Sequence, residues 1–180
     1  MSLETFATSL QATSLSTALK TITWIIPALQ SIHILMIGVV FVAILVVSLR
    51  VLGRMRTDES LVTVWRRFAP FFWTALVLMA ITGAVLTVAE PVREFMTLSF
   101  RLKMVLLVVG IGSALLFGRR MRREAAVSVG SASASRGARM AAILTLVLWI
   151  AVIFLGRAIA YDTSVWGKWS PVKSVGGAAT

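Results

Sequence analysis

The chain has 180 residues, of which 58% are apolar and 14% are charged, and its mean hydropathy is +0.92. Because an ordinary soluble domain has about 45–50% apolar and about 25% charged residues, this composition excludes a water-soluble globule and predicts a single membrane domain. The net charge of +11 would favour nucleic acid in a soluble protein, but the basic residues here flank apolar segments, which excludes nucleic acid and makes the lipid bilayer the expected partner.

The first segment, residues 1–21, is polar and rich in Ser and Thr. Leu3, Phe6, Ala7 and Leu10 recur within it at helical spacing. Such a stripe predicts a short helix that lies on the membrane surface and ends near Ser14.

Four apolar segments follow, and each is long enough for the ~20 residues that a membrane-spanning helix needs. A short surface helix is expected before the second segment, with Thr57 as its N-cap and Leu61, Val64, Trp65 and Phe68 facing the lipid. We therefore expect an all-α polytopic membrane protein, an antiparallel bundle of four transmembrane helices. The expected spans are residues 22–49, 68–89, 100–118 and 140–161 of a domain covering 22–161, followed by a tail at 162–180.

Two loops of the chain are rich in arginine, and the second also contains a low-complexity Ser/Ala/Gly stretch typical of a flexible loop. The positive-inside rule places both loops in the cytoplasm and both termini outside a bacterial inner membrane. Trp166 and Trp169 would then belong to the outer aromatic belt. The eleven basic residues of the loops are Arg50, Arg54, Arg56, Arg66, Arg67, Arg119, Arg120, Arg122, Arg123, Arg136 and Arg139.

The scarcity of metal-binding and catalytic residue types excludes several classes of function. The chain has no cysteine and one histidine, so it cannot form a disulfide, a thiolate zinc site, a cysteine-ligated cluster or bis-histidine haem ligation on its own. The seven acidic residues all lie outside the apolar segments, which argues against an ion-driven pump. The motifs of soluble catalytic sites are absent from the sequence.

Polar residues gather in the outer half of the expected spans. His33 lies about 13 Å from the outer edge of the first span at ~1.5 Å per residue, and Gln30 shares its helix face. Lys103 and Arg157 lie close to the outer ends of the third and fourth spans, and Tyr161 follows Arg157 by one turn.

A histidine at that depth cannot reach water and is a functional candidate by default. Helical bundles hold haem through axial histidines, and Lys103 and Arg157, which we expect to point into the bundle, would suit the two propionates. Other interpretations of these three residues remain open. His33 would also be stable as a neutral imidazole bonded to Gln30 or to a threonine, and the two cations would also be stable if they reached the headgroups.

Several short motifs are distributed over the four spans and their ends. They are Trp24-Ile-Ile-Pro27, Ser31-Ile-His33, Gly38, Leu49-Arg50-Val-Leu-Gly53, Thr82-Gly83, Leu102-Lys103 and Gly156-Arg157-Ala-Ile-Ala-Tyr161. Together these motifs resemble an uncharacterised bacterial family of small four-helix inner-membrane proteins. Gln30 and Ser48 stand where that family more often has acids. More distantly, the segments around His33 and Lys103 are similar to HemJ-type protoporphyrinogen oxidases and to copper-resistance-D membrane proteins. The first similarity implies a b-type haem held by His33 with Lys103 near the cofactor or substrate, and the second implies copper passage.

The expected function is that of an inner-membrane protein that binds one haem b through His33, with Lys103, Arg157, Gln30 and Tyr161 around it. It would act in electron transfer or porphyrin oxidation, or as the membrane anchor of a redox complex with other membrane or periplasmic subunits. The alternatives are a structural or accessory subunit without a cofactor and a copper-handling membrane protein.

Overall fold

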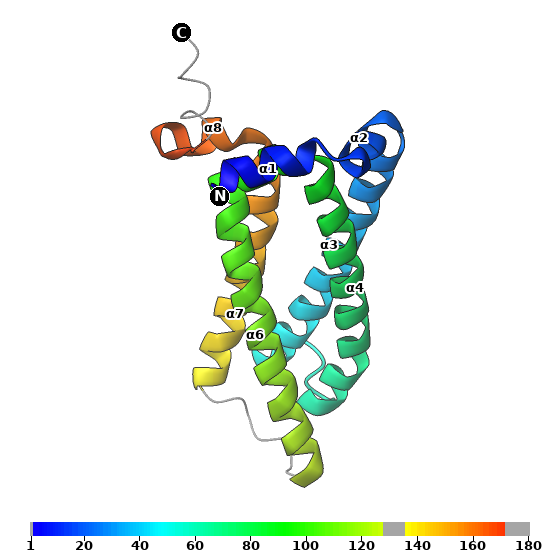
Figure 1. Cartoon of the computed structure of the whole chain (residues 1–180). Helices are drawn as coiled ribbons and strands as arrows, with labels where there is room; N and C mark the ends of the chain where they lie inside the picture. Colours follow the sequence, from blue (N-terminus) through cyan, green and yellow to red (C-terminus); the bar gives the residue numbers. More distant parts are fainter. Residues whose placement is uncertain (1, 128–135, 172–180) are drawn as a thin grey trace.

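The structure is a computed structural model that describes residues 2–127 and 136–171 (Figure 1). Its described residues form helices and contain no strand. Four helical segments are long and apolar enough to cross a membrane, and the long helices that form them are α3 (Ile25–Val51), α4 (Leu61–Ala89), α6 (Leu98–Val127) and α7 (Arg136–Ala158). The expectation of an all-α chain with four such helices is confirmed for the described residues.

Two of the long helices extend beyond their apolar parts, and the separate surface helix predicted before the second span is wrong. The surface helix expected before the second span is the beginning of α4 itself, and its N-cap is Ser60, which accepts a hydrogen bond from the Thr63 amide, instead of Thr57. Val64, expected to face lipid, is fully buried. Likewise α6 continues to Val127 through the segment expected to begin a loop, and residues 128–135 of that loop lie outside the described residues.

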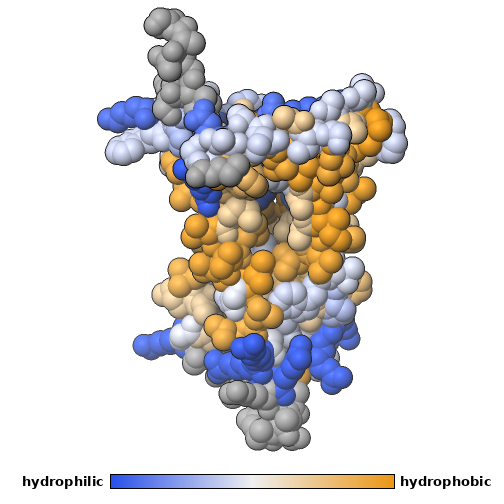
Figure 2. Space-filling model, viewed as in Figure 1, coloured by the Kyte–Doolittle hydropathy of each residue, from blue (hydrophilic) through white to orange (hydrophobic). Residues whose placement is uncertain are grey.

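The core of the molecule lies between α3, α4 and α7. α3 packs against both α4 and α7, and α6 packs mainly against α7. Figure 2 shows the resulting band of apolar surface between two hydrophilic ends. Trp149, read from the sequence as a packing residue, is 3% exposed and meets Phe72 edge to face at 6.0 Å between ring centroids. The buried cluster consists of Val40, Ala43, Ile44, Phe72, Ala75, Leu76, Met79 and Trp149.

Short helices cover one end of the four long helices, which we call the capped end (Figure 1). The predicted stripe forms α1 (Leu3–Gln11), and a second helix, α2 (Ser14–Thr21), begins where the stripe stops. α1 packs on α5 (Pro91–Met96), with Phe6 and Phe95 edge to face, and Ser16 of α2 bonds the Ala89 carbonyl at 3.2 Å. The chain returns to this end through η1 (Ile159–Tyr161), α8 (Asp162–Trp166) and η2 (Gly167–Trp169).

The opposite end carries most of the arginines, and we call it the arginine-rich end. It consists of the α3–α4 connection, the first turns of α4, the C-terminal part of α6 and the beginning of α7. Figure 2 shows hydrophilic residues clustered there below the apolar band. The residues predicted to share one side of the membrane are therefore together at one end of the described structure.

Candidate functional site

His33 forms a hydrogen bond between helices in the half of the molecule nearer the capped end. Its Nδ1 lies 2.8 Å from Oγ1 of Thr82 on α4. The Thr82 hydroxyl is also 2.9 Å from the carbonyl oxygen of Leu78, one turn earlier, and donates to it. A threonine hydroxyl has one proton, so when Thr82 gives it to Leu78 it accepts from His33 Nδ1–H. In that arrangement the neutral imidazole is protonated at Nδ1 and carries its lone pair on Nε2.

The place of this imidazole between α3 and α4 depends on a glycine. A Cβ atom at Gly83 would lie 3.2 Å from Cε1 of His33, closer than side chains normally approach. Gly83 therefore lets the ring of the half-buried His33 lie directly against α4. The side-chain hydrogen bond of this ring is made by Nδ1, and the ring also interacts with the backbone carbonyl of Met79, so Nε2 is the ring nitrogen that Thr82 does not engage.

Lys103 of α6 extends into the same region. Its side chain is half-buried and runs past α7 at Gly156, where a Cβ atom would lie 3.6 Å from the lysine Nζ. Lys103 acts electrostatically on His33 and on Glu94 of α5. Neither carboxylate oxygen of Glu94 comes within 4.0 Å of Nζ, so the lysine has no direct ion pair with the described side chains.

Glu94 is an acidic group of the site that the sequence did not single out. It is half-buried under α1, and burial raises the pKa of its carboxyl, while the charges of Lys103 and Arg93 oppose that rise. A carboxyl group and a lysine thus lie on the capped side of His33, and together they could hold a ligand with both anionic and donor groups.

The other predicted site residues are exposed and form no described hydrogen bond with His33. Arg157 is exposed, and the expectation that it points into the bundle is wrong. Because Gly156 faces Lys103 and successive helix residues differ by about 100°, Arg157 turns outward. Its guanidinium lies 5.2 Å from the ring centroid of the exposed Tyr161, and its Nη2 donates to the Tyr161 hydroxyl at 3.3 Å. Gln30 is exposed and bonds no described side chain.

Asp162 is the centre of a polar network at the capped end of the described structure, and its partners could not be recognised from the sequence. Its carboxylate, 4% exposed, accepts from the Ser99 amide at 3.0 Å, the Ser99 hydroxyl at 2.7 Å and the Ser170 hydroxyl at 2.6 Å. Trp166 Nε1 donates to Ser99 Oγ at 2.8 Å. Asp162 therefore caps the N-terminus of α6 from the far end of the chain.

Comparisons of the chain with models of protein families, with curated proteins and with solved structures find no match. The resemblance drawn from the sequence motifs stays a prediction. In the described part of the chain, no group of three or more His, Cys, Asp or Glu side chains comes together as a metal site would require.

Proposed function

We propose that the chain is a bacterial inner-membrane protein that forms an antiparallel bundle of four transmembrane helices. The four apolar helices and the concentration of arginine at one end support this placement. The arginine-rich end faces the cytoplasm in this proposal, and the capped end, which carries both described ends of the chain, faces outward.

Single cysteines test the orientation, because the native chain has none. Thr57 and Ser9 are exposed at the arginine-rich and capped ends respectively. In spheroplasts, we expect a membrane-impermeant maleimide to label Ser9→Cys and to label Thr57→Cys only after lysis. Labelling of Thr57→Cys in sealed spheroplasts would show that the orientation is the reverse.

Within the bundle, we propose that His33 holds one b-type haem through Nε2, near the outer face. The observation that carries this proposal is the hydrogen bond between His33 Nδ1 and Thr82 Oγ1, which engages Nδ1 and not Nε2. Metal-binding histidines usually donate their other ring N–H to an oxygen acceptor in this way. Figure 2 supports it by showing that the apolar band is hollowed near the capped end.

The chemistry of the surrounding residues fits such a group. When bound, a haem supplies one-electron chemistry, which suits electron transfer or porphyrin oxidation, alone or as the membrane anchor of a redox complex. Thr82 holds the imidazole through Nδ1, and Gly83 gives the ring room against α4. Lys103 provides a cation for a propionate on the capped side of His33. Arg157 is exposed beside Tyr161, and we assign it no part in holding the group.

The visible spectrum of the purified protein tests this proposal. The protein, isolated from haem-replete cells in mild detergent, should show a Soret band at a stoichiometry near one haem per chain. Its α and β bands should sharpen after dithionite reduction. A preparation that is folded by circular dichroism but has no Soret band would contradict the proposal.

A second candidate is an accessory subunit without a cofactor. The observation that favours it is the same contact, since His33 bonds Thr82 and packs against Gly83 as a residue joining two helices would. In that case α3 and α4 hold together through His33, and the site around Lys103 binds a partner or lipid. A colourless folded protein that co-purifies with other membrane subunits would favour this candidate.

A further inference from the structure

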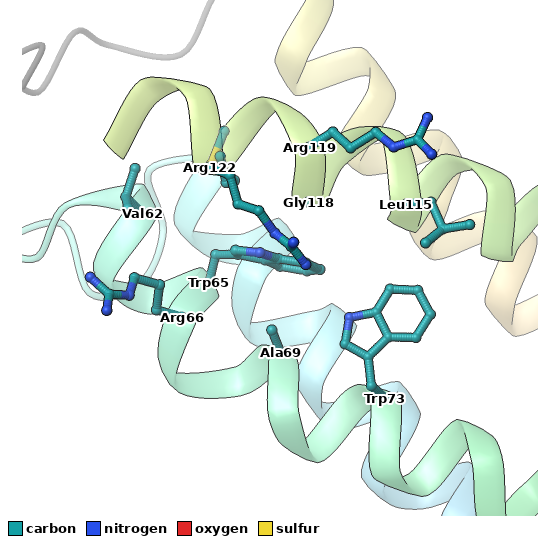
Figure 3. Close-up of a pocket in the computed structure, with 10 residues that line it drawn as sticks. Val62, Trp65, Arg66, Ala69, Trp73, Leu115, Gly118, Arg119 and Arg122 are labelled. Atoms are coloured by element: carbon teal, nitrogen blue, oxygen red, sulfur yellow. The ribbon is translucent and has the colours of Figure 1, made fainter. Parts of the chain in front are cut away.

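A pocket opens at the arginine-rich end, between the N-terminal half of α4 and the C-terminal half of α6 (Figure 3). Its volume is about 610 Å³, within the range of roughly 300–1,000 Å³ that is usual for ligand sites. The pocket is separate from the region of His33, which contacts α4 near its opposite end, at Thr82. The lining residues used below are Trp65, Ala69, Trp73, Leu115, Arg119 and Arg122, together with Arg66 and Gly118.

The wall of the pocket is held in place by contacts between the two helices. A Cβ atom at Gly118 would lie 3.1 Å from Cζ2 of Trp65, so the absence of a side chain there lets the indole lie against α6. Trp65 also meets Phe117 edge to face, with 5.1 Å between ring centroids. The half-buried rings of Trp65 and Trp73 therefore form a fixed aromatic surface between α4 and α6.

The mouth of the pocket is strongly basic. Figure 3 shows the Arg122 side chain reaching over the Trp65 ring, while the side chains of Arg66 and Arg119 point away from the two tryptophan rings on opposite sides. The side chains of all three are exposed, and no carboxylate of a described side chain lies within 4.0 Å of them. Two other arginines of this end, Arg56 and Arg67, form ion pairs with Glu59. The three arginines at the mouth are Arg66, Arg119 and Arg122.

The pocket continues into apolar surface. Leu115, in its lining, is 45% exposed, and Val108, two helical turns earlier on the same face of α6, is 70% exposed. Phe71 of α4 is also exposed, at 60%. A ligand bound among the arginines could thus extend an apolar chain along α6 into the membrane.

We propose that this pocket binds an anionic phospholipid, with the phosphate at Arg122 beside Trp65, the positive charges of Arg66 and Arg119 on either side, and an acyl chain along Leu115 and Val108. Arginine pairs bidentately with phosphate oxygens, and basic pockets between helices on the cytoplasmic side suit acidic lipid headgroups. The aromatic wall lies where tryptophan is favoured, at the boundary between headgroups and acyl chains. This inference rests on the proposed membrane placement and is independent of the haem.

The test measures lipid binding to the detergent-solubilised protein by titration in native mass spectrometry. The probes are dioleoyl-phosphatidylglycerol, dioleoyl-phosphatidylcholine and inorganic phosphate. Arg119→Gln/Arg122→Gln removes two charges from the pocket, and Arg54→Gln/Arg136→Gln removes two exposed charges from the same end outside it. At about 1 kcal/mol per basic residue, we expect the first pair to weaken phosphatidylglycerol binding about 30-fold and the control pair to change it less than about threefold.

A third variant fills the pocket without changing its charge. Ala69→Phe places a ring in the space beside Trp73 and should also weaken phosphatidylglycerol binding by tenfold or more, while circular dichroism confirms the helical content. The proposal is overturned if both double variants lose affinity equally. It is also overturned if phosphatidylcholine binds as tightly as phosphatidylglycerol, or if inorganic phosphate competes at a concentration similar to that of the lipid, which would indicate a soluble anion as the ligand.

Discussion

We expect His33→Ala to abolish the Soret absorption of the purified protein, because it removes the one imidazole that the chain can offer to a haem iron. The four helices should still insert, since the substitution does not lower their hydropathy. The lost hydrogen bond to Thr82 should cost on the order of 0.6 kcal/mol, the average for polar contacts between membrane helices. The measurement compares absorbance at the Soret maximum per chain with thermal stability in detergent.

Two further substitutions distinguish binding of the haem iron by His33 from a purely structural contact of His33 with α4. His33→Gln can still bond Thr82 but is a poor iron ligand, so it should keep the stability of the native protein and lose the band. Gln30→Ala removes a polar group on the same helix face that is exposed and makes no described contact, and it should leave the spectrum unchanged. If His33→Gln retains the full Soret band, the iron ligand is not His33.

Hydropathy was sufficient to predict the four long helices but not their ends. The predicted spans stop where apolar residues give way to charge, as at Gly118, because hydropathy measures the preference for lipid. The α-helix continues through Arg119 and Arg122, since arginine is a good helix former and backbone hydrogen bonds do not require an apolar environment. For the same reason α4 begins at Leu61 instead of Phe68.

The sequence was sufficient to predict how deep each site residue lies along its helix, but not which way its side chain points around the helix axis. Counting residues placed His33 and Lys103 in the same half of the membrane, and the structure brings them within electrostatic range. For Arg157, counting residues gave the depth but not the direction, and the side chain is exposed instead of pointing into the bundle. A helix that is apolar on all sides has no polar face to show which way a residue points. Asp162 has its main partner, Ser99, 63 residues away, and no local pattern links two such positions.

Asp162→Ala is expected to release the C-terminal segment from the start of α6. The native carboxylate satisfies the Ser99 amide and hydroxyl and the Ser170 hydroxyl in a buried site. Loss of a helix cap costs about 0.5–2 kcal/mol, and each buried donor left unpaired adds about 1–3 kcal/mol. With some relaxation, we expect local stability to fall by about 3 kcal/mol, which corresponds to about 100-fold faster hydrogen exchange at the Ser99 amide.

Matched variants show whether the effect arises from this network. Asp58→Ala removes an acid that is exposed at the arginine-rich end, and exchange at Ser99 should not change. Asp162→Asn keeps one oxygen acceptor but loses the charge that favours the N-terminus of α6, so its effect should lie between those of Asp58→Ala and Asp162→Ala. Trp166 fluorescence offers a second measurement, because the indole N–H of Trp166 donates a hydrogen bond to the Ser99 hydroxyl. In Asp162→Ala we expect this indole to become exposed to water. If exchange at Ser99 and the emission of Trp166 both match the native protein in Asp162→Ala, the C-terminal segment is held by its apolar contacts and not by the carboxylate.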